Sequence, residues 1–474
     1  MASILPMPSP GSRRWLRRGL VAVVVLLVLL GGTVAVLLAH SPHNVSHPDV
    51  EFTAPTTTTV AAAPPRKKVA VDNSVWPRYG FDAARTHFFP GTKVPQPPLH
   101  VGWRFQDYAL LEFPPVIYQT RLYLIDDDGS AKALDKRTGH KLWETKVGTL
   151  AAASPALGIK QGLMYVGLLS TSRHTGQTPG NGRFAALSMK TGRVVWSKVI
   201  PAGTESSPIA YGNAVYFGDQ GGTVYSLNAT TGQENWTYHA SGAVKGGPAL
   251  ANGILYFGDY SGRAYAVNAA TGHQIWAVNT NGADFGFGSG NFYSTPAVAF
   301  GRVYMGNTDG RVYSFAAKTG QLAWATGTGA YVYASAAVDN APGLGPTIYL
   351  GSYDGNFYAF DARSGAIRWR HPAGGKISGS ATIVGNVVYY SDLGTKTTAG
   401  LDVRTGRQVF SFPDGAFNPV VADDAAIYLS GYTMLYQMLP NRSANVISTQ
   451  RKQRTHKVHT AVLRAHEIPA QAVQ

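Results

Sequence analysis

Short runs of alternating polar and apolar residues recur along this chain, and glycine-rich turns separate them. In residues 218–236, G-D-Q-G-G-T-V-Y-S-L-N-A-T-T-G-Q-E-N-W, positions 224–227 alternate with the period of two that is typical of a β-strand. The pair Thr231-Gly232 follows this run, and its glycine can adopt the positive φ that a short hairpin loop requires. Residues 258–276 repeat the whole unit. The pattern therefore predicts an all-β chain built from copies of one hairpin unit.

The aromatic residue that ends the unit recurs along the chain, and a T-G or S-G pair precedes it each time. It stands at Trp143, Trp196, Trp236, Trp276, Trp324, Trp369 and Phe410. Upstream of each unit lies a second hairpin, whose first strand often follows a small residue and a proline, as at Ser207-Pro208 and Thr295-Pro296. Four strands in each period of about 40–50 residues is the signature of a β-propeller with one blade per repeat.

The two ends of the repeat region each carry part of a blade. Trp103 stands one period before Trp143 but has no T-G hairpin or upstream strands of its own. At the other end, strands without a tryptophan are predicted at 418–421, 427–429 and 435–438. We expect these fragments to combine. The prediction is an eight-bladed β-propeller whose ring closes by pairing its first and last strands, which removes exposed sheet edges.

An uncharged stretch of twenty residues, 19–38, follows four arginines near the amino terminus. Its length matches the apolar core of a bilayer, and the preceding arginines predict a cytoplasmic N-terminus and an extracytoplasmic propeller. We therefore predict an uncleaved single-pass signal anchor in the cell membrane, with a cleaved signal peptide as the alternative. The predicted parts are a short basic cytoplasmic segment, a transmembrane anchor, an extended Pro/Thr/Ala-rich linker, the propeller and a basic disordered tail, at 1–18, 19–38, 39–72, 73–440 and 441–474.

The net charge of +15 is spread in a way that does not favour nucleic-acid binding. Residues 1–72 contribute a net +4 and residues 441–474 a net +5, which leaves +6 for the large body between them. A nucleic-acid-binding domain more often concentrates its positive charge on one folded face. The chain contains no cysteine, which excludes disulfides, a thiolate nucleophile and a cysteine-ligated metal.

The repeat resembles the tryptophan-docking repeat of the pyrroloquinoline-quinone (PQQ)-type propellers, whose pattern is A-x-[DN]-x-x-T-G-x-x-x-W. Here it reads L-D-K-R-T-G before Trp143 and F-D-A-R-S-G before Trp369. The opening segment Trp76–Thr86, with W-P-R-Y-G-F-D and then R-T, is similar to the segment that precedes the first blade in that family. The resemblance covers about residues 75–440 and implies that each tryptophan docks between neighbouring blades.

This family contains both enzymes and non-enzymatic members. Its dehydrogenases hold PQQ with a bridge between adjacent cysteines, a tryptophan floor and a calcium or lanthanide site of Glu, Asn and Asp. Its other members include the lipoprotein propeller of outer-membrane assembly. Because this chain has no cysteine and lacks the large insertions of the enzymes, no residue can be matched to a catalytic, cofactor-binding or metal-binding position.

One position in each blade is expected near the mouth of the central channel, three residues before the proline that opens the inner strand. Around the ring we assign it to Phe113, Ala152, Glu205, Lys245, Tyr293, Tyr333, Ser378 and Ala416. One glutamate is too few for a metal site, which needs several converging oxygen ligands. Glu205 and Lys245 on adjacent blades are candidates for ligand binding, and the alternative is that they form a structural ion pair.

Two insertions, 168–184 and 279–292, interrupt the period and are predicted on the same face of the propeller. The first carries Arg173 and His174, and the second carries Phe285, Phe287 and Phe292 just before Tyr293. Loops on a rigid scaffold commonly bind ligands, and exposed aromatic side chains suit a partner surface. The alternative is that the phenylalanines plug the mouth of the channel. The histidines show no metal-binding spacing, and no nucleophile or phosphate-binding motif occurs.

These observations favour a non-enzymatic, membrane-anchored binding or scaffolding module for a protein or cell-envelope polymer. No cofactor is predicted for that function. The alternative is a quinoprotein dehydrogenase that uses PQQ and calcium to oxidise alcohols or sugars.

Overall fold

The structure is a computed structural model, and it describes residues 20–29, 44–55, 75–91, 94–169, 182–280, 290–417 and 420–441. The chain divides into two compact units, Met1–Asn44 and Val45–Gln474. In the first unit, residues 20–29 form a helix within the predicted anchor. Among the residues described, no helix is both long and apolar enough to cross a membrane.

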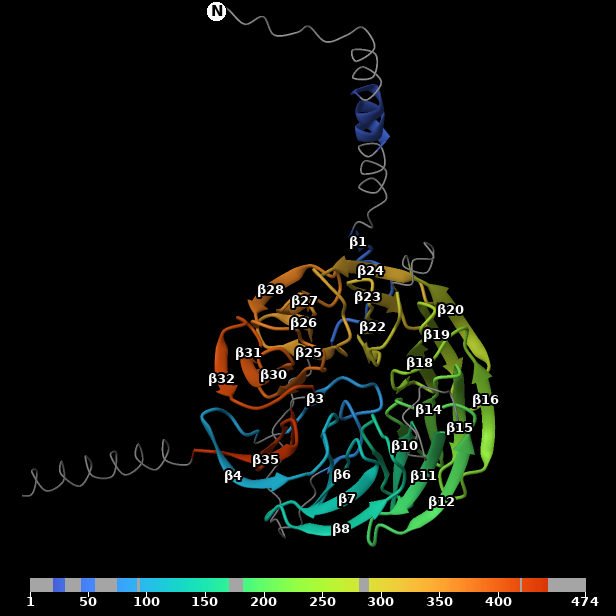
Figure 1. Cartoon of the computed structure of the whole chain (residues 1–474), viewed down its shortest axis with the longest axis vertical. Helices are drawn as coiled ribbons and strands as arrows, with labels where there is room; N and C mark the ends of the chain where they lie inside the picture. Colours follow the sequence, from blue (N-terminus) through green and yellow to red (C-terminus); the bar gives the residue numbers. More distant parts are fainter. Residues whose placement is uncertain are drawn as a thin grey trace, which may run out of the picture. The chain divides into compact units, whose positions relative to one another are not determined.

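The second unit is a ring of sheets around a central channel (Figure 1). Counted over the described residues, there are eight sheets. The first four blades consist of β5 (Val116–Tyr118), β6 (Arg121–Ile125), β7 (Ser130–Asp135) and β8 (Lys141–Lys146); β9 (Ala156–Gly158), β10 (Leu163–Leu168), β11 (Gly182–Ser188) and β12 (Val194–Ile200); β13 (Ile209–Tyr211), β14 (Ala214–Gly218), β15 (Thr223–Asn228) and β16 (Glu234–His239); β17 (Ala249–Ala251), β18 (Ile254–Gly258), β19 (Arg263–Asn268) and β20 (Gln274–Asn279).

The remaining blades follow the same order from the inner strand to the outer strand. They consist of β21 (Ala297–Ala299), β22 (Arg302–Gly306), β23 (Arg311–Ala316) and β24 (Leu322–Gly327); β25 (Ala337–Ala341), β26 (Gly345–Gly351), β27 (Asn356–Asp361) and β28 (Ile367–Pro372); β29 (Thr382–Val384), β30 (Val387–Asp392), β31 (Thr397–Asp402) and β32 (Gln408–Phe412); β33 (Val420–Ala422), β34 (Ile427–Ser430), β35 (Met434–Pro440) and β4 (Leu99–Gln106). Three short strands, β1 (Val45–Ser46), β2 (Val75–Trp76) and β3 (Phe88–Phe89), join blades 5, 1 and 7.

The eight-bladed prediction and the way the ring closes are both confirmed. Blade 8 combines β4 from the beginning of the propeller with β33–β35 from its end, and Trp103 pairs with Gln437 across the closure. Two ion pairs strengthen this junction. Lys132 contacts Asp107 at 2.7 Å, and Lys136 contacts Asp423 at 2.7 Å, with all four side chains buried.

Each docked tryptophan donates a hydrogen bond to the next blade, as the repeat pattern implies. The indole N–H of Trp324 donates to the carbonyl of Ala362 at 3.0 Å, and a Cβ on Gly365 would lie 2.6 Å from the Trp324 ring. Glycine is therefore required in the T-G or S-G pair for two reasons. The turn needs a positive φ at this position, and a side chain there would collide with the indole ring. Phe410 takes the tryptophan position in blade 7 and faces blade 8, where β35 and β4 come from opposite ends of the propeller and no T-G turn joins them.

Residues 77–89, which we call the N-terminal strap, lie inside the ring against the inner strands. Backbone N–H groups of five inner strands donate to carbonyls of this strap, from Leu157, Leu250, Val298, Val338 and Ile383. The fully buried guanidinium of Arg85 donates to the carbonyls of Ser207 at 2.7 Å and Pro248 at 3.0 Å. Burial lowers the pKa of Arg85 to about 9. The strap therefore ties consecutive blades together from inside the ring.

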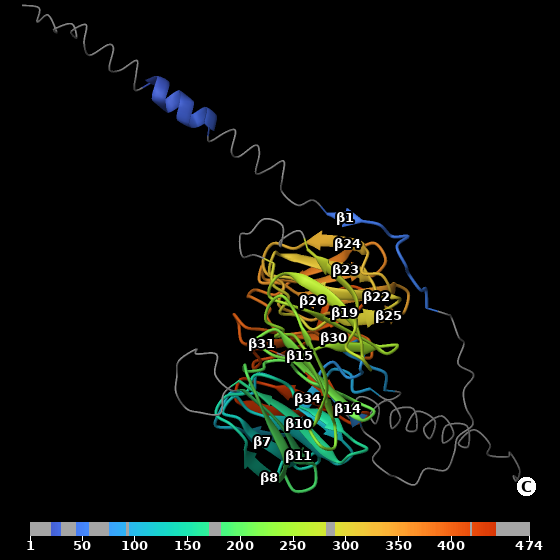
Figure 2. The same cartoon turned by 90° about the vertical axis from the view of Figure 1, so that its right-hand side faces the viewer.

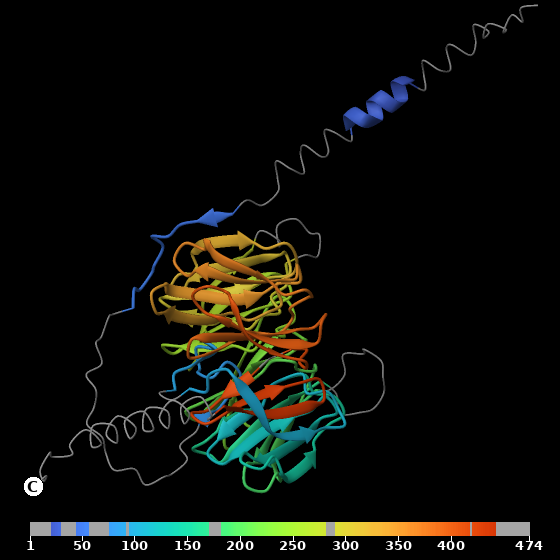
Figure 3. The ribbon, with the colours of Figure 1, turned by 90° about the vertical axis from the view of Figure 1, so that its left-hand side faces the viewer.

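Residues 45–53, which we call the N-terminal clip, lie within the segment predicted as an extended linker. Here β1 pairs with the outer edge of β24 (Figures 2 and 3). The guanidinium of the buried Arg302 donates to the carbonyl of Glu51 at 2.6 Å, and Phe52 lies against that guanidinium. An outer sheet edge offers unpaired backbone groups, so a short adjacent segment can dock there in spite of its loop-like composition.

Candidate functional site

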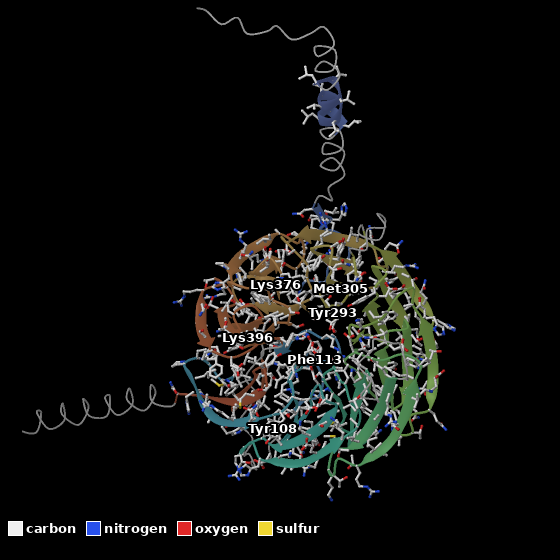
Figure 4. The ribbon with its side chains drawn as sticks, viewed as in Figure 1. Tyr108, Phe113, Tyr293, Met305, Lys376 and Lys396 are labelled. Carbon is white, nitrogen blue, oxygen red and sulfur yellow. The ribbon has the colours of Figure 1, made fainter. Side chains whose placement is uncertain are left out.

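The loops that lead from each outer strand to the next inner strand surround a cavity of about 200 Å³ at one end of the channel. We call this end the mouth face. Figure 4 shows Phe113 and Tyr293 near the centre of the ring, with Tyr108, Lys376 and Lys396 around them. The cavity is lined mainly by aromatic and charged side chains, with small hydroxyl-bearing residues beneath them. The aromatic and charged lining comprises Tyr79, Glu112, Phe113, Glu205, Lys245, Tyr293, Tyr333, Tyr353 and Phe417.

Most of the ring positions assigned from sequence converge here as expected. The cavity is lined by Phe113, Glu205, Lys245, Tyr293, Tyr333 and Ser378. Blade 1 requires a correction of one residue. Its inner strand begins at Val116 directly after Pro115, so the position three before the proline is Glu112, and Phe113 is its neighbour. The assignment to Phe113 counted from Val116 instead of from Pro115, and the corrected position adds a second carboxylate to the site.

Glu205 and Lys245 form the ion pair that was the structural alternative for these residues. The Nζ of Lys245 lies 3.0 Å from Oε1 of Glu205, and both side chains are largely buried. Gln220 also donates to Oε1 of Glu205, and the Tyr293 hydroxyl donates to Oε2 at 3.2 Å. The ammonium of Lys245 lies 5.0 Å from the centroid of the Tyr260 ring. The pair is therefore embedded in the wall of the cavity.

An arc of tyrosines continues around the mouth from this pair. The ring centroids of Tyr293 and Tyr333 are 5.5 Å apart with their planes nearly perpendicular, and those of Tyr333 and Tyr353 are 4.8 Å apart. The Nζ of Lys376 lies 5.5 Å from the Tyr353 centroid. Burial and the nearby Glu205 and Glu112 carboxylates raise the pKa of Tyr293, so its hydroxyl is neutral and a hydrogen-bond donor. Sequence reasoning missed Tyr353, which lies in a repeat turn.

Glu112 lies in a region of negative potential. Burial, with the nearby carboxylates of Asp127 and Glu205, raises the pKa of Glu112 to about 7. Burial and the adjacent carboxylates of Asp126 and Asp128 raise the pKa of Asp127 to about 7 as well. Like charges and desolvation both disfavour the ionised form of a carboxyl group, so this side of the cavity attracts positive charge.

The floor of the cavity is a chain of hydrogen bonds between neighbouring blades. The backbone N–H of Ser335 donates to the hydroxyl of Ser380 at 2.9 Å, and the N–H of Thr295 donates to the hydroxyl of Ser335 at 2.9 Å. The hydroxyl of Tyr79, which belongs to the strap, donates to Ser380. Because Tyr79 is buried and the strap lies beneath it, the cavity is reached from the mouth face.

The structure describes only one of the candidate residues from the two insertions. Arg173, His174, Phe285 and Phe287 lie outside the described residues. Phe292 is fully buried, where it packs with Met305 and Tyr313 in the core between blades 4 and 5. Its place in an exposed aromatic surface is therefore corrected. It follows the glycine-rich loop and precedes β21, and its backbone N–H donates to the carbonyl of Asp259 at 3.0 Å.

The cavity does not fit the cofactor that the resemblance implies. PQQ carries carboxylates and needs cationic partners, whereas the lining contains Glu112 and Glu205 against Lys245, which Glu205 already engages. Among the described residues, no group of three or more His, Cys, Asp or Glu side chains could hold a metal ion. The cavity lining among those residues also includes no tryptophan, and the chain has no cysteine. We therefore derive no reaction step through PQQ or calcium.

Comparison with known proteins agrees with the fold. A family model described as outer membrane protein assembly factor BamB matches residues 101–212, 127–326 and 334–453, and curated protein sequences give no significant match. BamB from Moraxella catarrhalis has a TM-score of 0.58 at 16% identity, covering 73% of this chain and 98% of that one. A europium-containing methanol dehydrogenase has a TM-score of 0.64 at 13% identity, covering 77% and 98%. Quinohemoprotein alcohol dehydrogenase from Comamonas testosteroni has a TM-score of 0.60 at 14% identity, covering 77% and 80%. At these identities the structural likeness concerns the fold alone, and the resemblance to PQQ-type propeller repeats is confirmed.

Proposed function

Since the chain belongs to the family of the outer membrane protein assembly factor BamB, we propose that its propeller is a non-enzymatic scaffold that binds a protein partner at the mouth face. The name of that family describes a protein that acts in assembly, which is a binding function. The described residues of the cavity supply no nucleophile paired with a base and no cluster of metal ligands. Binding is the function that this set of side chains supports.

The observation that carries the proposal is a rim of exposed apolar and aromatic side chains around the cavity. Tyr108 is fully exposed, and Leu150, Tyr331 and Tyr432 are each more than two-fifths exposed on loops of the mouth face. Lys396 lies 5.2 Å from the Tyr432 ring centroid. Aromatic side chains are enriched in protein interfaces, and loops on a rigid scaffold are where binding residues concentrate.

The proposal includes attachment to the cell membrane through residues 19–38, with the propeller on the extracytoplasmic side. Its support is the uncharged sequence after the arginine cluster. A further support is that the helical residues 20–29 are valine, leucine and alanine with exposed side chains. An isolated helix that is apolar on every side is stable in an apolar environment. Such an attachment would hold the propeller in the cell envelope, within reach of envelope proteins.

Affinity purification of the full chain from its native membranes, after reversible crosslinking, tests this function. We compare Tyr331→Glu and Tyr432→Glu with Tyr211→Glu, because Tyr211 is also exposed but is the last residue of β13, at the end of the inner strand away from the mouth. The expected result is that the mouth-face variants lose one or more partners at least 5-fold while Tyr211→Glu retains them. Equal recovery from all three variants would refute a mouth-face binding site.

A further inference from the structure

We infer that the cavity receives one cationic side chain, lysine or arginine, from the partner protein. The inference rests on the proposed function and adds the chemistry by which the partner is recognised. A propeller that presents a lined cavity at the centre of its binding face can receive a single anchoring side chain, and such buried anchors contribute most of the energy of many interfaces. The wall residues decide which kind of side chain this is.

The charge of the lining favours a cation. The cavity wall carries the carboxylates of Glu112 and Glu205 and the ammonium of Lys245, a net charge of about −1 when both acids are ionised. Lys245 is held against Glu205 at 3.0 Å and over the ring of Tyr260, so its positive charge is balanced within the wall. Glu112 adds negative charge on the adjoining side, and Asp127 beyond it reinforces that charge. An incoming ammonium or guanidinium would reduce the repulsion among these carboxylates.

The aromatic lining supports the same kind of ligand. Phe113, Tyr293, Tyr333, Tyr353 and Phe417 all contribute to the cavity. A cation within about 6 Å of an aromatic centroid is attracted by the negative face of the ring, and this attraction grows when the site is desolvated. Rings at several angles, as in the nearly perpendicular pair Tyr293 and Tyr333, surround a cation from more than one side. The protein already uses this contact at Tyr260 and Tyr353, whose rings lie near Lys245 and Lys376.

The size and depth of the cavity suit one side chain. An engineered cavity of about 150 Å³ accommodates benzene. The volume here, about 200 Å³, therefore accepts a single lysine or arginine side chain. The floor of Tyr79 and Ser380 ends the cavity at the strap, so a long chain cannot pass through the ring at this point. A side chain entering from the mouth would leave its backbone on the rim beside Tyr331.

Binding of a cation should depend on pH because Glu112 titrates near neutrality. A cation favours the ionised form of Glu112, so its binding should strengthen as the pH rises from 6 to 8. The charged or titratable groups that face Glu112 from the neighbouring elements are Asp127, Glu205, Lys245, Tyr79 and Tyr293. The tyrosines stay neutral in this range because their pKa values are raised, which leaves the carboxylates to set the pH dependence.

The test titrates the purified full chain with Nα-acetyl-lysine methylamide, and with the norleucine analogue as a neutral probe of matched shape, followed by NMR at pH 6 and pH 8. We expect the lysine probe to bind at least 10-fold more tightly than the norleucine probe. We also expect Glu112→Gln to weaken lysine binding at least 5-fold and to remove its pH dependence. Glu234→Gln, a charge removal on the outer strand β16, is the control and should change nothing.

Equal binding of the two probes, or an unchanged affinity in Glu112→Gln, would overturn the inference. Because these probes need no partner, such a result would leave the mouth-face scaffold to be judged by the crosslinking variants alone. A second titration uses the chain without residues 442–474, which carry all of the charge of the basic tail. Binding that appears only after this removal would identify the tail as the occupant and overturn assignment to a partner. Equal binding with and without the tail supports the assignment.

Discussion

The Nζ of Lys245 lies 3.0 Å from Oε1 of Glu205, although the two residues belong to the loops that open different blades. The repeat brings them together because each occupies the same position in its own blade. The ion pair therefore forms part of the wall that joins blades 3 and 4 at the mouth. Its geometry accounts for both residues without a bound ligand, and Glu112 and the tyrosines line the same cavity.

A double-mutant cycle with Glu205→Gln and Lys245→Met should measure the coupling free energy of this ion pair. The side chains are largely buried, so we expect a coupling free energy of about 1 kcal/mol or more. The control is the exposed pair Lys198 and Glu234, 3.2 Å apart, which should couple more weakly. The measurement is urea unfolding of the single and double variants. A coupling near zero at Glu205–Lys245 would contradict the pairing.

Truncation of a docked tryptophan should destabilise the ring strongly. Trp324 is fully buried and donates to the carbonyl of Ala362 in the next blade. We expect Trp324→Ala to cost about 3–5 kcal/mol, because it leaves a cavity where the indole was; the Ala362 carbonyl keeps the Tyr304 hydroxyl as a donor. Trp143→Ala, at a more exposed site of the same repeat, should cost less. Unfolding midpoints check this order, and a larger loss for Trp143→Ala would contradict the packing described.

The free energy of unfolding should depend on pH through the titration of Glu112. Its pKa is raised from 4.5 to about 7, so the folded protein holds a proton between these values that the unfolded chain has released. The contribution of this group to stability therefore falls as the pH rises through that window. We expect Glu112→Gln to gain on the order of 1–3 kcal/mol relative to the parent between pH 4 and pH 8. Urea unfolding at both pH values measures this, and a constant difference would show that Glu112 does not titrate there.

The docking of the N-terminal clip on blade 5 should depend on Arg302. We expect Arg302→Lys to release residues 45–53, because an ammonium cannot reproduce the planar fork that reaches the carbonyls of Glu51 and Val50. Asp49→Ala removes only an exposed partner of Arg363 and should leave the clip in place. Hydrogen–deuterium exchange over 45–53 distinguishes the two variants. Slow exchange retained in Arg302→Lys would show that strand pairing alone holds the clip.

The repeat pattern predicts the blades, their number and the closure, because each T-G turn and tryptophan acts through local geometry. The ring of residues around the mouth is predicted at most positions, but in blade 1 the position was assigned one residue too late, to Phe113 instead of Glu112. The strap and the clip could not be predicted in the same way. Their segments lack strand periodicity. The strap is held inside the ring by its own Arg85, which donates to the carbonyl of Ser207. The clip is held by Arg302, which lies far from it in the sequence and donates to the carbonyl of Glu51.

The central claim is that the partner sits over the cavity on the mouth face. Site-specific photocrosslinking in native membranes tests it most directly, with Tyr331→p-benzoylphenylalanine on the rim and Tyr211→p-benzoylphenylalanine away from it. We predict a discrete adduct from position 331, with the crosslinked peptide containing a lysine or arginine, and no corresponding adduct from position 211. An adduct from position 211 alone would contradict the claim and place the partner away from the mouth.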